Sequence, residues 1–190
     1  ALYNFGVWIS GAGSKVTSAG HVSITGTSGA AVTNQSYNDG VMIQNSAEVS
    51  TTGAGNLSIS GTGATSSGTY NHGVNLAGSS TVSTASGTLS ITGVTGTQGG
   101  SSFGVAVGSG TQVSTSSGNI SITGTSRISG QYGYGFWLGD NYTKIRAGGS
   151  GNITINGTSS DIGSGDALGM QIRTAGSITT NNGNISLTGT

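Results

Sequence analysis

The sequence contains no cysteine and no proline among its 190 residues, and only 5% of those residues are charged. Without cysteine the chain cannot form disulfides, use a thiolate in catalysis or bind zinc through sulfur. Five basic and five acidic side chains balance to a net charge of zero, which excludes a nucleic-acid-binding protein with a basic face. No apolar run approaches the roughly 18 residues of a membrane-spanning helix, so we expect no membrane insertion in this segment. The 38 glycines follow no every-third-residue rule, which excludes collagen.

A seven-residue motif that occurs six times is the most regular feature present. It reads Gly-x-aliphatic-Ser/Thr-aliphatic-polar-Gly, as in GHVSITG and GNLSISG. Its copies occupy residues 20–26, 55–61, 87–93, 118–124, 151–157 and 183–189. The starts of successive copies lie 31 to 35 residues apart. Repeats of this length indicate a solenoid, a propeller or an array of small units.

Two further segments recur in phase with this motif. One begins with glycine followed by apolar, variable and apolar residues, at 6–9, 40–43, 73–76, 104–107, 135–138 and 169–172. The other centres on a single β-branched residue, which is Val16, Val49, Val82, Val113, Ile145 or Ile178. Apolar and polar residues alternate in all three segments, as they do in half-buried strands. Each repeat therefore predicts three short strands, and the chain as a whole predicts an all-β fold.

Three strands per repeat are too few for a propeller blade, which has four strands and usually about 40 or more residues. We therefore predict a right-handed parallel β-helix, a solenoid of about six coils of roughly 33 residues with three short strands per coil. The whole chain, 1–190, is then one segment. Its repeats are approximately 1–33, 34–67, 68–98, 99–129, 130–163 and 164–190. We expect these six turns to belong to a longer rod.

In such a fold, equivalent residues stack about 4.8 Å apart along the axis and form columns of one chemical type. One inward column is predicted to be Val7, Val41, Val74, Val105, Phe136 and Met170. Another is predicted to be Ile24, Ile59, Ile91, Ile122, Ile155 and Leu187. Glycines, those of the motif among them, are expected at the corners, where a positive φ is needed. A partial column that caps backbone groups beside one corner is expected from Asn56, Asn119, Asn152 and Asn184.

Repeats such as GNISITG in a charge-poor chain rich in Gly, Ser, Thr and Asn resemble the β-helical shafts of large bacterial surface adhesins. These are the filamentous-haemagglutinin-like proteins of two-partner secretion and related autotransporter-type proteins. The resemblance implies an extracellular protein, secreted or at the cell surface of a Gram-negative bacterium, in which a stiff spacer displays a binding region. Its coils are longer than the roughly 20-residue coils of many such shafts, because a connection of 11 to 14 residues joins one repeat to the next.

The titratable residues do not predict catalysis, a metal site or a cofactor. The carboxylates Asp39, Glu48, Asp140, Asp161 and Asp166 are spread over different coils, without a recurring base or nucleophile. They also lack the spacing of a calcium-binding β-roll. We expect His21 and His72 to be polar surface residues, and Asp140 to form a surface ion pair with Arg173 of the next coil. The chain is therefore predicted not to be an enzyme.

Aromatic side chains give the one candidate for ligand contact. Trp8 and Trp137 occupy outward positions of strands, and the long connections that carry several tyrosines should all emerge at one corner. The residues predicted to contact a ligand are Trp8, Tyr37, Tyr70, Tyr132, Tyr134 and Trp137. Aromatic rings on this side suit sugar stacking, contact with a protein of a host or neighbouring cell, or self-association into filaments. Packing of the loops over that face is the competing structural interpretation.

The sequence is compatible with two other functions. Outward Ser/Thr pairs such as Ser90/Thr92 and Ser121/Thr123 form two files of hydroxyl groups, which resemble the ice-binding faces of threonine-ladder β-helices. The mixture of serine with threonine departs from the regular methyl groups of those faces. The other alternative is a polysaccharide-active β-helical enzyme. The function that the sequence favours is a structural module of an extracellular adhesin or surface filament.

Overall fold

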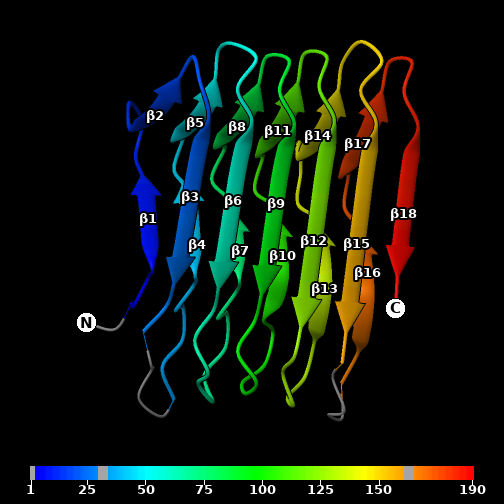
Figure 1. Cartoon of the computed structure of the whole chain (residues 1–190). Helices are drawn as coiled ribbons and strands as arrows, with labels where there is room; N and C mark the ends of the chain where they lie inside the picture. Colours follow the sequence, from blue (N-terminus) through cyan, green and yellow to red (C-terminus); the bar gives the residue numbers. More distant parts are fainter. Residues whose placement is uncertain (1–2, 30–33, 161–164) are drawn as a thin grey trace.

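The strands wind into one solenoid whose coils follow each other from the N-terminus to the C-terminus (Figure 1). The computed structural model describes residues 3–29, 34–160 and 165–190, and every regular element in them is a β-strand. In Figure 1 each coil runs up the rear, passes over the top and returns down the front while advancing from left to right. This is a right-handed winding, the usual sense of parallel crossovers. The predicted fold class is confirmed. None of the described residues belongs to a helix that could span a membrane.

Each coil contributes one strand to each of three parallel six-stranded sheets. Sheet A consists of β1 (Val7–Ser10), β4 (Val41–Gln44), β7 (Val74–Leu76), β10 (Phe103–Val107), β13 (Gly133–Leu138) and β16 (Ala167–Ile172). Sheet B consists of β2 (Lys15–Ser18), β5 (Glu48–Thr51), β8 (Thr81–Thr84), β11 (Gln112–Thr115), β14 (Lys144–Ala147) and β17 (Ser177–Thr180). Sheet C consists of β3 (Val22–Thr27), β6 (Leu57–Thr62), β9 (Leu89–Val94), β12 (Ile120–Ser126), β15 (Ile153–Ser159) and β18 (Ile185–Gly189).

The register between coils follows the sequence repeat. Val74 pairs with Val105, 31 residues later, and Ile24 pairs with Ile59, 35 residues later. Differences in coil length are therefore absorbed in the turns, while equivalent strand residues stay opposite each other. Both predicted columns pair residue by residue, and all of their members except Leu187 in the last coil, which is 44% exposed, contribute to the core.

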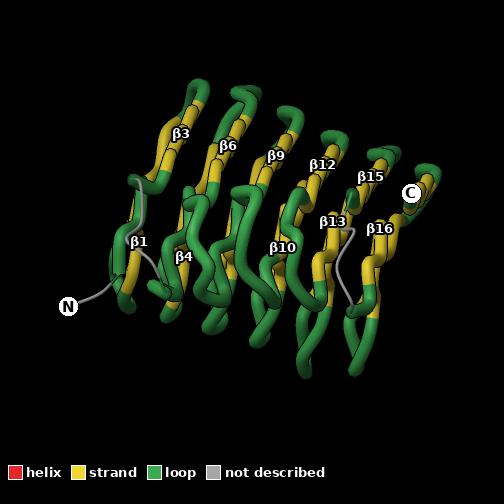
Figure 2. The backbone as a smooth tube through the Cα atoms, turned by 90° about the horizontal axis from the view of Figure 1, so that it is seen from below, coloured by secondary structure: helices red, strands yellow, loops and turns green. Residues whose placement is uncertain are grey.

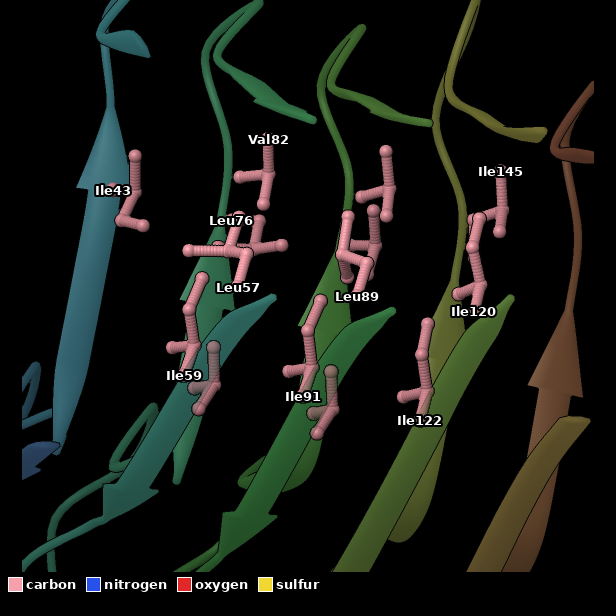
Figure 3. Packing of buried hydrophobic residues seen from close by; sticks show 14 of the residues in the cluster. Ile43, Leu57, Ile59, Leu76, Val82, Leu89, Ile91, Ile120, Ile122 and Ile145 are labelled. Atoms are coloured by element: carbon pink, nitrogen blue, oxygen red, sulfur yellow. The ribbon is translucent and has the colours of Figure 1, made fainter. Parts of the chain in front are cut away.

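The inward residues of the three sheets form one continuous aliphatic core. Ile59, Ile91 and Ile122 repeat from coil to coil in the same orientation, with Val and Leu of the other sheets facing them (Figure 3). These side chains are 1% exposed or less. Successive side chains of a strand point to opposite faces of the sheet. The apolar residues of each strand therefore face the core, and the polar residues between them face the solvent.

Ten of the twelve motif glycines, all but Gly20 and Gly189, serve close backbone approach, and for the motif glycines the prediction of a positive φ is wrong. None of the twelve has a positive φ; the glycines that do are Gly11, Gly13, Gly78, Gly99, Gly110 and Gly149. A Cβ on Gly93, near the end of β9, would lie 2.0 Å from the carbonyl oxygen of Gly104, near the beginning of β10 in sheet A. A Cβ on Gly87 would lie 2.0 Å from the carbonyl oxygen of Gly55 in the previous coil. Glycine is required here because no side-chain atom fits between the backbones.

The long connections from sheet C to the next sheet A lie together along one side of the solenoid, at the bottom of Figure 1 and nearest the viewer in Figure 2. Each connection has two legs, one that leaves sheet C and one that enters sheet A. The legs approach each other, since a Cβ on Gly63 would lie 2.4 Å from the carbonyl oxygen of Asn71. The connections bury polar residues, including Asn38, Asn71 and Ser102. Asn71 Oδ1 accepts a hydrogen bond from the Asn38 backbone N–H at 3.0 Å, and Ser102 Oγ accepts one from Asn71 N–H at 2.9 Å. Side chains thus link successive connections as the ladders link successive strands.

The predicted asparagine column is confirmed beside another corner. Asn119 Oδ1 accepts a hydrogen bond from the backbone N–H of Asn152 at 2.8 Å. Asn152 Oδ1 in turn accepts one from Asn184 N–H at 2.8 Å. In the first coil His21 takes the equivalent place, with Nδ1 accepting from Asn56 N–H at 3.0 Å. Each side chain satisfies a backbone donor of the next coil, which explains why the column extends from coil to coil.

Candidate ligand-binding site

Aromatic side chains gather on the connections and on the outward positions of sheet A, and we call this surface the aromatic face. Its members are Tyr3, Phe5, Trp8, Tyr37, Tyr70, Phe103, Tyr132, Tyr134 and Trp137. The rings of Tyr37 and Tyr70 stack with centroids 5.2 Å apart, and those of Phe103 and Tyr134 stack at 5.0 Å. His72 lies between these pairs, 6.2 Å from Tyr70 and 4.9 Å from Phe103. The contacts therefore run along the solenoid axis across the first five coils.

A pocket of about 300 Å³ opens at the N-terminal end of the aromatic face. It is lined by Tyr3, Phe5, Trp8, Tyr37, Asp39, Met42, Gln44 and Asn75. Trp8 is 58% exposed and its ring lies 5.4 Å from that of Phe5. Asp39 and Asn75 lie side by side, because Asp39 Oδ2 accepts a hydrogen bond from Asn75 Nδ2 at 3.1 Å. The pocket combines aromatic walls with a carboxyl and amide groups, the composition typical of small-ligand sites.

A second pocket, of about 320 Å³, lies farther along the same face. It is lined by Tyr70, Ser101, Phe103, Tyr132, Tyr134, Trp137, Asp166, Gln171 and Arg173. Gln171 hydrogen-bonds to Tyr134, while Gln171 Oε1 has no partner within the described ranges. Burial raises the pKa of the Tyr134 hydroxyl, and the nearby Asp166 charge adds to the shift. That hydroxyl therefore remains protonated at neutral pH and keeps a proton to donate.

The structure places all six predicted contact residues in these two pockets, with different exposures. Trp8, Tyr37, Tyr70 and Tyr132 are more than 40% exposed. Trp137 is half-buried, because its indole lies over the backbone of Gly108 and Gly139, where a Cβ would meet ring atoms at 2.7 and 2.4 Å. Tyr134 is 6% exposed and lies beneath the others. Trp137 and Tyr134 thus form the inner part of the second pocket, while the other tyrosines and Trp8 form the outer surface.

Three tyrosines of the aromatic face hold a backbone conformation that non-glycine residues avoid. Tyr37, Tyr70 and Tyr132 have φ of 62°, 58° and 60°. They occupy equivalent positions in their coils, a column to which Ser101, at φ 46°, also belongs. A left-handed conformation costs roughly 1–2 kcal/mol for a residue with a Cβ. The same conformation recurs in the turns that follow sheet A, at Ser79, Ser109 and Tyr142 among others, so it is a feature of the corners of the coil and does not single out the aromatic face.

The predicted surface position of His72 is wrong. His72 is 5% exposed, and its Nδ1 accepts a hydrogen bond from the Phe103 backbone N–H at 2.9 Å. Burial lowers the pKa of its imidazole to about 3. Asp39, which in the sequence is one of several scattered acidic residues, is also buried. Its Oδ1 accepts a hydrogen bond from His72 N–H at 2.8 Å. Burial raises the pKa of the Asp39 carboxyl to about 7, against the opposing effect of its hydrogen bonds.

These two buried groups should oppose each other in the pH dependence of stability. Between about pH 4 and pH 6.5 the unfolded chain binds a proton at His72 that the folded chain lacks, which lowers stability as the pH falls. Over the same range the folded chain keeps a proton on Asp39 that the unfolded chain loses, which lowers stability as the pH rises. The two slopes, each about 1.4 kcal/mol per pH unit, should nearly cancel.

Asp39→Asn should therefore expose the histidine contribution. Its free energy of unfolding, measured by urea denaturation, should fall by about 1.4 kcal/mol per pH unit from pH 6.5 to pH 4 relative to the parent chain. The exposed Asp140 provides the matched control, since Asp140→Asn should leave the profile unchanged. A flat difference between Asp39→Asn and the parent would show that burial does not raise the pKa of Asp39, and a flat profile of Asp39→Asn itself would show that His72 does not stay neutral in the fold.

The remaining charged groups form no candidate catalytic or metal centre in the part of the chain that the structure describes. Lys15 Nζ and Glu48 Oε2 lie 2.7 Å apart on the surface of sheet B, and this pairing lowers the pKa of Glu48. The predicted ion pair between Asp140 and Arg173 is not formed; Asp140 Oδ2 accepts from Ser109 Oγ at 3.2 Å. Residues 3–29, 34–160 and 165–190 contain no group of three His, Asp or Glu side chains able to hold a metal ion. Asp161 lies outside the described residues.

Comparison of the chain with family models, with curated proteins and with solved structures finds no match.

Proposed function

We propose that the chain is a structural, non-enzymatic module of an extracellular bacterial adhesin or surface filament, in which it acts as a stiff spacer. The observation that carries this proposal is the unbroken register of three parallel sheets across all six coils. Six coils rise about 29 Å at about 4.8 Å each, and each coil is bonded to its neighbours on three sides. Such a ladder resists bending without a disulfide or a metal ion.

The surface chemistry supports the same role. The outward residues are mainly Ser, Thr, Asn and Gly, and the net charge is zero. The core is made of columns of similar aliphatic residues, so coils are interchangeable units whose number sets the length of the rod. A secreted Gram-negative protein is the setting that the repeat style favours.

The test is the location of the protein on intact cells of its source. Proteinase K added to intact cells should remove the signal of an antibody raised against residues 34–160, while a cytoplasmic marker persists. If the signal survives on intact cells and disappears only after lysis, the extracellular proposal is wrong.

Ice binding is the second candidate, because sheet C holds its outward hydroxyl files in register. Ser90 and Thr92 pair with Ser121 and Thr123, so hydroxyl groups repeat at about 4.8 Å across the sheet and about 6.6 Å along each strand. We expect no thermal hysteresis, since serine lacks the methyl group of threonine. Hysteresis that is lost in Thr92→Lys and Thr123→Lys would favour ice binding over the spacer.

A further inference from the structure

We propose that the aromatic face binds a neutral, linear oligosaccharide whose chain lies along the solenoid axis, with one subsite at each of the two pockets. This inference is separate from the spacer role, because a rod without bound sugar would still be a rod. The proposal assigns a class of ligand to the aromatic face, which the fold by itself does not do.

Aromatic stacking is the first reason. The apolar face of a pyranose ring packs on an aromatic ring, and the ring of Trp8, which is 58% exposed, offers such a surface. Tyr37 and Tyr70 stack on each other with centroids 5.2 Å apart and extend the aromatic surface with their exposed edges. The two pockets are connected, since the Tyr37 ring at the first stacks on the Tyr70 ring at the second. A continuous row of rings suits a chain of sugars better than a single small molecule.

Polar groups at each pocket can bind sugar hydroxyls. In the first pocket the buried Asp39 accepts hydrogen bonds from His72 N–H and Asn75 Nδ2, and Asn75 and Gln44 also line the pocket. In the second pocket Gln171 has a carbonyl oxygen without a partner in the described ranges, next to the protonated hydroxyl of Tyr134. A few fixed polar groups among aromatic walls orient a ligand and give it specificity.

The charge of the face indicates a neutral ligand. The charged residues that line the two pockets are Asp39, Asp166 and Arg173. Among the described residues that line the pockets, Arg173 is the only basic one, and Asp166 in the same pocket offsets its charge, so no basic cluster there could neutralise sulfate, uronate or sialate groups. An anionic glycan would therefore lack a partner for its charges.

The length of the row indicates a linear chain. Trp8 and Trp137 lie four coils apart, which corresponds to about 19 Å along the axis at about 4.8 Å per coil. Several sugar units are needed to cover that distance. Tyrosines occupy the same corner position in the second, third and fifth coils, and Ser101 occupies it in the fourth.

The two tryptophans of the chain provide a reporter in each pocket, because Trp8 lines the first and Trp137 the second. Trp137→Phe leaves Trp8 as the single fluorophore, and Trp8→Phe leaves Trp137. Titration with cellohexaose, a linear β-linked chain of neutral pyranoses, should change the emission of both variants in a saturable way. A change in neither variant overturns the proposal, and a change in only one overturns the two-subsite arrangement.

Substitutions then test the mode of binding by calorimetry on the full chain. Tyr37→Ala should weaken cellohexaose binding about tenfold. Tyr142→Ala is the matched control, since Tyr142 is 78% exposed, has φ of 66° and lines neither pocket. Circular dichroism and thermal unfolding must show that both variants fold. Equal affinities of the two variants, or tighter binding of an oligogalacturonate than of cellohexaose, would contradict stacking of a neutral sugar.

Discussion

Removal of residues 74–104 should give a chain that still folds, with one coil fewer. The deletion joins Gly73 to Val105, which is the register partner of Val74, so β10 takes the place of β7 beside β4. In sheets B and C the strands on either side of the deletion also become neighbours, with Val113 opposite Val49 and Ile122 opposite Ile59. In a solenoid, stability is a sum of coil and interface contributions, so only a modest part of the free energy of unfolding should be lost.

The matched control removes residues 74–88, which is about half a coil. It joins Gly73 to Leu89, the first residue of β9. A strand of sheet C then stands in the chain where β7 of sheet A is needed to pair with β4 and β10. The first coils then cannot continue into the last ones, and cooperative folding should be abolished. Circular dichroism and thermal unfolding distinguish the two outcomes. Equal damage from both deletions would mean that the coil is not the unit of folding.

Gly93→Ala should be strongly destabilising although it adds a single methyl group. The added Cβ would meet the Gly104 carbonyl oxygen at 2.0 Å, and backbone cannot rotate away as a flexible side chain can. Either β9 or the beginning of β10 must move, in the middle of two sheets whose ladders fix them. We expect a loss of about 3 kcal/mol or more in the free energy of unfolding, a large part of the stability of a domain.

Gly20→Ala is the control for this substitution. Gly20 begins the same motif, but its Cβ would meet nothing closer than the Ser18 hydroxyl oxygen at 3.7 Å, and its φ is not positive. The variant should therefore differ from the parent by no more than about 0.5 kcal/mol in chemical denaturation. A mild effect at Gly93 similar to that at Gly20 would show that the sheets can separate at the glycine contact.

The sequence predicted the strands and their register because stacking makes each column repeat its residue type, as Ile24, Ile59 and Ile91 do. The role of the motif glycines was not predictable. Glycine permits a positive φ and also permits backbone contact, and the sequence pattern is the same in both cases. Only the geometry around Gly93 and Gly104 separates the two.

The connections were predicted least well. The first two share the motif Tyr-Asn-x-Gly at 37–40 and 70–73, but this pattern does not indicate that its variable residues, Asp39 and His72, would be buried or would contact each other. The tyrosines were found because they are large aromatic residues at one corner. Their division between two pockets depends on how the legs of each connection pack, which is set by tertiary contacts.

The direction of the hydrogen bonds between coils has a mechanical consequence. Because each bond joins a strand to its equivalent in the next coil, these bonds lie along the axis, and a pull on the chain ends loads them in tension rather than in shear. Terminal coils should then peel away one after another while the rest stay paired. Each released coil of 31 to 35 residues would extend to roughly 100–125 Å. In the proposed adhesin, such a shaft would lengthen in steps when flow pulls on the attached cell, and each step would dissipate part of the applied force.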